Sequence, residues 1–234
     1  MSAEEGISVW LRPERPPRDR RLSRERIVAC AVEILDAEGH RGLSMRRVAA
    51  ALEVTAGSLY WYVATKDELL ELALDAVLAE AGPDPGAAGW REALGALARG
   101  RRAMLLRHPW VLSQLAAQPN MGPNALALTE TGLALLASAG FAGADLDAAL
   151  AAVNDHVTGA VMAETSWRAM AGRAGSERWR ARMDDFVRGV AERHPLLGER
   201  MAAAGETDLD RECERRFAFG LDTLLDGLEK RRPV

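Results

Sequence analysis

Residues 44–66 hold the side chains whose types and spacing most clearly indicate a chemistry, and that chemistry is contact with DNA. Four small residues come just before three aromatic residues, and a cation stands on either side of the run. Small side chains let a helix lie deep in a DNA groove, hydroxyl and methyl groups can meet base edges, and cations beside free helix amides bind phosphate. The candidate DNA contacts are Arg46, Thr55, Ala56, Gly57, Ser58, Tyr60, Trp61, Tyr62 and Lys66.

Different parts of DNA are assigned to different members of this set. We assign phosphate contacts to Arg46, Tyr60 and Lys66. Backbone or base-edge contacts are assigned to Trp61 and Tyr62. Two plainer interpretations stay open, because the cations could be ordinary solvated charges and the aromatic residues could anchor a small core. The four small residues carry almost no long side chains, so direct readout would depend on hydroxyls, methyl contacts and close approach.

Two short helices, at 45–52 and 56–62, are predicted to position these side chains. Ser44 and Thr55 precede them as N-caps, because a side-chain hydroxyl can accept a hydrogen bond from an otherwise unpaired backbone amide. Apolar residues at helical spacing let each helix pack on the other, and the opposite face of the second helix carries the DNA candidates. The packing residues are Val48, Leu52, Leu59 and Val63.

A helix on each side completes the predicted head. The first begins after Ser23, with Glu25 in its first turn, and ends at Gly39 as a C-cap. The second begins with the capping box Thr65–Glu68 and continues to the breaker cluster 82–86, which we take as the domain boundary. The buried stripes are Ile27, Ala31, Ile34 and Leu35 in the first helix and Leu70, Leu74, Val77 and Leu78 in the second.

The helix lengths, the turn length, the aromatic triplet 60–62 and the trailing Lys66 together resemble the DNA-binding head of the tetracycline-repressor (TetR) family of bacterial transcription regulators. The resemblance is close over residues 23–78 and looser beyond Trp90. It implies an all-helical homodimer whose heads bind a palindromic operator and whose C-terminal domain binds a small-molecule inducer. One departure is Glu53, which stands in the turn where the family commonly has glycine. A left-handed backbone there would cost a non-glycine residue about 1–2 kcal/mol.

Composition and charge agree with an all-α chain that has one basic end. The 234 residues are 48% hydrophobic with a formal net charge of −4, and abundant Ala and Leu with few β-branched residues favour helix. Residues 12–26 hold seven arginines against three acidic residues, which suits a protein that touches nucleic acid with one part only. We expect a flexible basic arm at 1–22, a helix-turn-helix domain with its linking helix at 23–82, and a ligand-binding and dimerisation domain at 87–234.

The arginines of the arm have two interpretations. The arm could be a solubilising tail, or it could insert arginines into the minor groove beside each head, where narrow A·T tracts concentrate negative potential. The candidate minor-groove residues are Arg12, Arg15, Arg18, Arg20 and Arg21.

The C-terminal domain is predicted to hold about six helices, including a long apolar-rich helix at 145–170 and a last helix at 208–230. Aromatic and methionine side chains with polar neighbours suggest an adaptable cavity for a bulky organic molecule, although core packing competes at each position. The candidate ligand contacts are Met104, Trp110, Asn154, Thr158, Met162, Glu164, Trp167 and Met170.

An apolar stripe on the last helix needs a cover, and a two-fold four-helix bundle with a second copy would supply it. The predicted dimer residues are Phe217, Leu221, Leu224, Leu225 and Leu228.

Motifs argue against an enzyme and against a metal or other cofactor. The sequence has no phosphate loop, nucleophile elbow or paired-cysteine site, and the pair 184–185 lacks the spacing of an aspartate-rich metal motif. The four histidines show no metal spacing. By the resemblance, Leu115 stands where the tetracycline repressors have a metal-positioning histidine. We therefore expect no magnesium–tetracycline site.

Cysteine use and hydropathy predict a cytoplasmic protein. Cys30 and Cys213 are isolated and are expected to stay reduced. The first ten residues are too polar for a signal peptide, and no run approaches the ~20 apolar residues of a membrane span.

The sequence thus predicts a homodimeric repressor that a small-molecule inducer releases from a palindromic operator. One rival is an activator, or a DNA-binding protein that needs no inducer. A second rival is a helical small-molecule-binding protein or enzyme in which the head is incidental.

Overall fold

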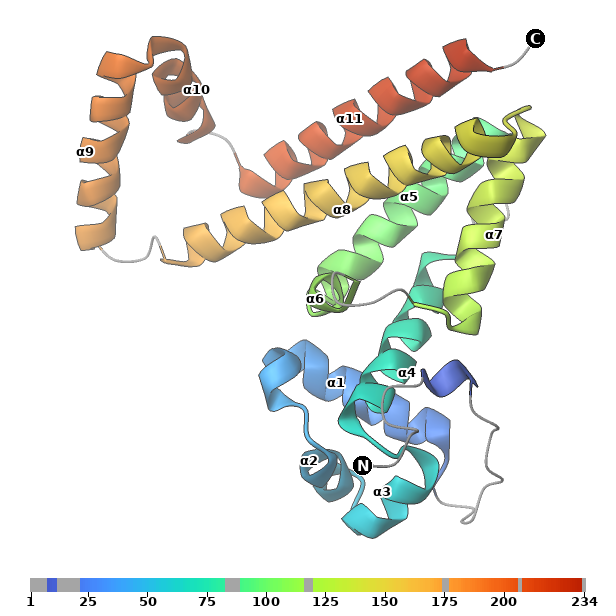
Figure 1. The fold of residues 1–234 in the computed structure, drawn as a ribbon. Helices are drawn as coiled ribbons and strands as arrows, with labels where there is room; N and C mark the ends of the chain where they lie inside the picture. Colours follow the sequence, from blue (N-terminus) through green and yellow to red (C-terminus); the bar gives the residue numbers. More distant parts are fainter. Residues whose placement is uncertain are drawn as a thin grey trace. The chain divides into compact units, whose positions relative to one another are not determined.

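The computed structural model describes residues 8–11, 22–82, 89–115, 120–173, 177–205 and 208–232. Within these ranges the chain folds into α-helices and two short 3₁₀ helices, which confirms the all-α prediction (Figure 1). The elements are η1 (Val9–Leu11), α1 (Arg24–Gly42), α2 (Met45–Ala51), α3 (Ala56–Tyr62), α4 (Lys66–Leu78), η2 (Ala79–Ala81), α5 (Trp90–Arg107), α6 (Val111–Leu115), α7 (Pro123–Ser138), α8 (Gly143–Arg173), α9 (Glu177–Arg193), α10 (Pro195–Gly205) and α11 (Leu209–Arg231).

Hydroxyl side chains start all four helices of the head. Ser23, Ser44, Thr55 and Thr65 each accept a hydrogen bond from the backbone amide three residues later, which confirms the caps predicted at Ser44, Thr55 and Thr65. Glu68 extends the last of these caps, since its Oε2 accepts from the amide of Ala64 at 2.8 Å. That amide lies one residue before the one that a capping box normally uses.

Helix α1 bends near its end instead of stopping there. Gly39 has a φ of +66°, as its predicted role as a C-cap requires, but helical backbone resumes and α1 runs to Gly42. The chain then turns into α2. Regular helix is thus interrupted at Gly39, where the sequence predicts the C-cap, and a short helical segment follows it to Gly42.

The core of the head is built from the apolar faces of α1, α2, α3 and α4. Helix α1 packs on α2 and α4, and α2 packs on α3. The side chains at the centre are at most 1% exposed: Ile27, Ala31, Leu35, Val48, Leu59, Val63 and Leu69. This core fixes the position of α3, whose other face is free.

The chain divides into two compact units, one of residues 1–151 with 232–234 and the other of residues 152–231. This division differs from the predicted boundary at 82–86, of which residues 83–86 lie outside the described ranges. In the first unit, α4 packs against α7, and η2 packs against α5. The helix that ends the head is therefore also part of the core that follows it.

The second unit contains most of α8 together with α9, α10 and α11. The His156 ring stacks on Phe217 with centroids 5.3 Å apart, and its Nε2 lies 3.0 Å from the Phe217 carbonyl oxygen. Gly220 permits this contact, because a Cβ there would lie 2.3 Å from the imidazole.

Helix α10, which packs against α9, was not among the predicted helices. It begins at Pro195, a residue that is well suited to a first helical turn. In the described part of the chain, no helix is both long enough and apolar enough to cross a membrane.

Candidate DNA-binding head

The turn between α2 and α3 has a left-handed backbone at the position where the family commonly has glycine. Glu53 has a φ of +57°, so this acidic residue adopts the left-handed conformation that favours glycine. The amide of Glu53 bonds to the carbonyl of Ala50 at 3.2 Å, and that of Val54 bonds to the carbonyl of Ala49 at 2.9 Å. These two bonds form a complete Schellman motif. The turn keeps its shape despite the strain, which sets the direction in which α3 leaves.

Helix α3 presents a nearly smooth face to solvent. Thr55, Gly57 and Ser58 are exposed, and Ala56 is half-buried. A Cβ added at Gly57 would meet no atom closer than the Thr55 Oγ1 at 3.8 Å, so packing within the chain does not require glycine there. The Thr55 Oγ1 caps the helix and lies 2.9 Å from the Ser58 Oγ. A face with so little side chain lets α3 approach another surface closely.

The aromatic triplet is split between surface and core. Tyr60 is 49% exposed, whereas Tyr62 is only 8% exposed and Trp61 is half-buried. The prediction that all three face outward was wrong for Tyr62. Its position three residues after the fully buried Leu59 places it on the inward face of the helix, beside Val63.

The two predicted phosphate ligands have different surroundings. Arg46 is exposed at the start of α2. Lys66 is half-buried, and its Nζ donates to the carbonyl oxygen of His40 at 3.1 Å. This bond ties the start of α4 to the end of α1. An ammonium group has three donors, so two remain for an anion.

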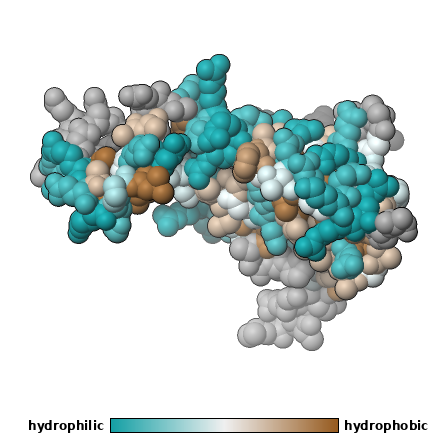
Figure 2. Space-filling model, turned by 90° about the horizontal axis from the view of Figure 1, so that it is seen from above, coloured by the Kyte–Doolittle hydropathy of each residue, from teal (hydrophilic) through white to brown (hydrophobic). Residues whose placement is uncertain are grey.

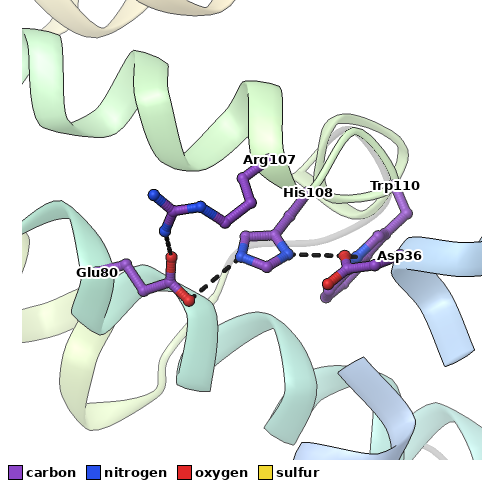
Figure 3. Close-up of polar contacts among 5 residues, drawn as sticks. All are labelled: Asp36, Glu80, Arg107, His108 and Trp110. Carbon is purple, nitrogen blue, oxygen red and sulfur yellow. Dashed lines mark hydrogen bonds and ion pairs between the residues drawn. The ribbon is translucent and has the colours of Figure 1, made fainter. Parts of the chain in front are cut away.

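A polar cluster that the sequence analysis missed joins the head to α5 (Figure 3). His108 is 3% exposed. Its Nδ1 lies 2.7 Å from the Asp36 Oδ1 of α1, and its Nε2 lies 3.2 Å from the Glu80 Oε1 of η2. Arg107 pairs with the other oxygen of Glu80. Because both ring nitrogens face carboxylates, the ring donates both hydrogen bonds only when it is protonated.

Trp110 belongs to the same cluster and does not line an open cavity. Its indole N–H donates to the Asp36 Oδ1 at 2.8 Å, and the side chain is 6% exposed. Its predicted role in ligand binding is therefore not supported by its contacts. Nothing in the spacing of His108 and Trp110 indicated a shared acceptor on α1.

A second missed feature is the carboxylate of Asp75, which caps α7 from the middle of α4. Its oxygens accept from the amides of Asn124 and Ala125 at 3.2 and 3.0 Å and from the Asn124 side chain at 3.0 Å. A Cβ at Gly122 would collide with this carboxylate at 2.1 Å. A charged residue within the otherwise apolar run 72–78 was the signal available in the sequence.

The other predicted ligand contacts are distributed between the two units. Met104 is 1% exposed and forms part of the first unit's core. In the second unit, Glu164 is 3% exposed and is held by Arg168, which also pairs with Asp210. Met162 and Trp167 are 56% and 44% exposed, and so lie on the surface of the chain. Asn154, Thr158 and Met170 are half-buried.

The apolar stripe of α11 is covered by its own chain. Leu224 is half-buried, and the other four residues are at most 8% exposed: Phe217, Leu221, Leu225 and Leu228. The reasoning that this stripe needs a second copy as cover was wrong, because intrachain packing supplies the cover. The predicted arm residues Arg12, Arg15, Arg18, Arg20 and Arg21 lie outside the described residues. Residues 8–11 correct part of the predicted flexible arm, because they contain η1 and lie against α4, where the Ser8 hydroxyl and the Val9 amide donate to the Glu71 Oε2 at 2.6 and 3.1 Å.

Comparison with known proteins agrees with this geometry. Residues 27–73 match the family model "Bacterial regulatory proteins, tetR family", and residues 82–232 match the model "Tetracyclin repressor-like, C-terminal domain". An HTH-type transcriptional regulator of Saccharopolyspora erythraea is 47% identical over 71% of this chain and 72% of its own length. The HTH-type transcriptional repressor DrrR1 of Streptomyces coeruleorubidus is 39% identical over 93% of this chain and 81% of its own length.

A solved structure extends the likeness to three dimensions. The crystal structure of Streptomyces coelicolor ActR in complex with actinorhodin superposes with a TM-score of 0.71 and 31% identity, over 90% of this chain and 96% of that one. Both domains and their order are thus shared with known regulators. The chain belongs to the tetR family of bacterial regulatory proteins, which are DNA-binding transcriptional regulators and not enzymes.

Proposed function

We propose that this protein represses transcription by binding a palindromic operator as a homodimer, and that a small organic inducer releases it. The observation that carries the proposal is the exposed face of α3, which has almost no long side chains. The buried Leu59 anchors the opposite face of the helix in the core of the head. A surface of this kind fits the major groove, where a recognition helix must lie close to base edges.

Contacts within the groove follow from the exposed residues of α3. Thr55, Ala56, Gly57 and Ser58 face the bases, and the exposed Tyr60 contacts the phosphate backbone. Trp61 is half-buried and can offer only part of its ring to DNA. The buried Tyr62 supports the helix from behind and reaches DNA at most through its hydroxyl.

Arg46 and Lys66 are proposed to hold phosphates on either side of α3. Arg46→Ala should weaken binding to all sequences alike and reduce the salt slope by about 0.9 per phosphate contact in each protomer. The control is Arg99→Ala, which removes another exposed arginine, from α5. Equal slopes for both variants would contradict the assignment.

The arm stays a separate proposal, because its arginines lie outside the described residues. If it enters the minor groove, removal of residues 1–21 should cost most affinity on operators with A·T-rich flanks, where the groove is narrow. The measurement is a titration of full-length and truncated protein on A·T-rich and G·C-rich flanks at one salt concentration. Equal losses on both would reduce the arm to a nonspecific tether.

For the homodimer, we propose faces of α8 and α11 other than the buried stripe. Met162 of α8 and Phe219 of α11 are 56% and 71% exposed. A Cβ at Gly159 or Gly227 would meet no atom within 4 Å, so these glycines leave room for close approach of another backbone. One face of the chain shows apolar patches among largely hydrophilic residues (Figure 2). Phe219→Asp should give monomers by light scattering.

Release by an inducer is supported by the relatives and by the polar cluster. ActR has been crystallised with actinorhodin, so that relative binds a small organic molecule. In this chain, His108 connects the end of α5 to α1, and Asp75 connects α4 to α7. A shift of α5 or α7 would therefore displace the head and change the spacing of two heads on half-sites about 34–36 Å apart.

The test is selection of bound sequences from random DNA by the full-length protein. We expect enrichment of a palindrome with half-sites about one helical turn apart. A reporter gene whose promoter overlaps the selected site should fall in output when the protein is present. Increased output would favour the rival activator, and failure to bind any sequence would favour a protein in which the head is incidental.

A further inference from the structure

Helix α5 carries one arginine in the middle of its buried face. At positions three and four residues before and after Arg101 stand Leu97, Ala98, Met104 and Leu105, and none of these four is more than 7% exposed. Side chains at this spacing share one face of a helix. Arg101 is therefore directed into the interior of the first unit, although its type would normally place it on the surface.

No acidic group balances this arginine within the described ranges. The Nε of Arg101 is buried and has no hydrogen-bond partner there. Six residues along the helix, Arg107 is exposed and pairs with Glu80. Burial without a nearby carboxylate lowers the pKa of Arg101. Even so, a guanidinium stays protonated in proteins, so the side chain keeps its positive charge.

An unpaired charge facing an apolar core lowers stability, because desolvation is not offset by a partner. The chain forms ion pairs for arginines elsewhere, as it does for Arg107 and Arg168. Arg101 is only half-buried as a whole residue, so its side chain is not fully enclosed. A charged group held this way is suited to a partner that arrives from outside.

We propose that Arg101 binds the acid group of the inducer, so that this regulator responds to organic anions with an apolar body. The inference rests on the proposed ligand-responsive function and specifies the ligand's class. A guanidinium binds a carboxylate or sulfonate through two parallel hydrogen bonds, which also fixes the orientation of the ligand.

The test uses two fluorescent probes that share a skeleton and differ in charge. The probe 8-anilinonaphthalene-1-sulfonate carries a sulfonate, and N-phenyl-1-naphthylamine lacks it. Arg101→Met keeps a similar side-chain length and removes the charge, and Arg99→Met removes an exposed arginine from the same helix as the control. Affinities are measured by fluorescence titration of full-length protein at one salt concentration.

We expect Arg101→Met to weaken sulfonate binding by about tenfold to a hundredfold, the loss typical of a charge-assisted hydrogen bond, and to change the neutral probe by less than about twofold. Arg99→Met should bind both probes as the unmodified protein does. Arg101→Lys should recover part of the sulfonate affinity, since it restores the charge without the two parallel bonds. An unchanged ratio of the two affinities in Arg101→Met, or no sulfonate binding by the unmodified protein, would overturn the proposal.

Thermal unfolding without any probe separates a binding role from a structural one. Removing an uncompensated buried charge should leave the midpoint of Arg101→Met unchanged or raise it. A clear fall would show that Arg101 supports the fold, and would overturn the proposal. Operator binding by the same variants keeps the two hypotheses apart. An unchanged probe ratio with intact operator binding refutes only the anion site, whereas no operator binding by the unmodified protein refutes the proposed function.

Discussion

Replacing Glu53 tests both the strain and the charge of the turn before α3. Its φ of +57° costs an L-residue about 1–2 kcal/mol, and glycine avoids that cost. Glycine also gains about 0.5–1 kcal/mol of conformational entropy in the unfolded chain, which acts in the opposite direction. The Schellman bonds use only backbone atoms, so they survive the change. Glu53→Gly should therefore stabilise each protomer by about 0.5–1 kcal/mol.

The charge of Glu53 is separable from its strain. A carboxylate in water about 8 Å from a phosphate is repelled by roughly 0.5 kcal/mol, which is about a twofold change in affinity for each half-site. Glu53→Gln removes the charge and keeps the strain, so it should raise DNA affinity without raising stability. Glu53→Gly should raise both.

Stability is measured by urea unfolding at one fixed protein concentration, because dimerisation would make the midpoint depend on concentration. DNA affinity is measured by fluorescence anisotropy at two salt concentrations. The gain from Glu53→Gln should shrink at the higher salt. A destabilised Glu53→Gly would refute the strain argument, and equal affinities for Glu53→Gln and the unmodified protein would show that the carboxylate does not face DNA.

Three further predictions follow from the contacts of the head. Gly57→Ala should leave stability unchanged or raise it by up to about 1 kcal/mol, since packing leaves room for a methyl group. The same change should weaken operator binding if α3 lies close to the DNA. Urea unfolding and fluorescence anisotropy on one sample measure the two effects. Lys66→Ala should lower the salt slope of DNA binding, and a loss confined to particular base sequences would contradict the phosphate assignment. Asp75→Ala should cost about 2–3 kcal/mol by urea unfolding, because the amides of Asn124 and Ala125 lose their acceptor; unchanged stability would mean that water replaces the cap.

Local rules explain what the sequence predicted correctly. Each N-cap joins residues three positions apart. Information of this kind is contained in a few consecutive residues. Helices α2 and α3 were predicted within one residue, whereas α1 resumes past Gly39 and α4 ends at Leu78, followed by the 3₁₀ helix η2, instead of continuing to residue 82.

The wrong predictions concern helix faces that pack against residues far away in the sequence. Tyr62 was taken as exposed because three adjacent aromatic residues look like surface, although its spacing from Leu59 puts it on the buried side. The stripe of α11 was assigned to a second copy because its cover, which includes His156 against Phe217, is 61 residues away. Arg101 could have been found from the helix pattern alone, since it interrupts the apolar face of α5.

The sequence separation between contacting residues also bears on the order in which parts of the chain fold. The caps of the head close over three residues, whereas the bond between His108 and Asp36 closes over 72. Closing a longer loop costs more entropy, and domains of a growing chain fold from the N-terminal end. During synthesis, the helix starts of the head can therefore form before α5 has left the ribosome. The His108 bond is made later, and it attaches the end of α5 to a head that is already in place.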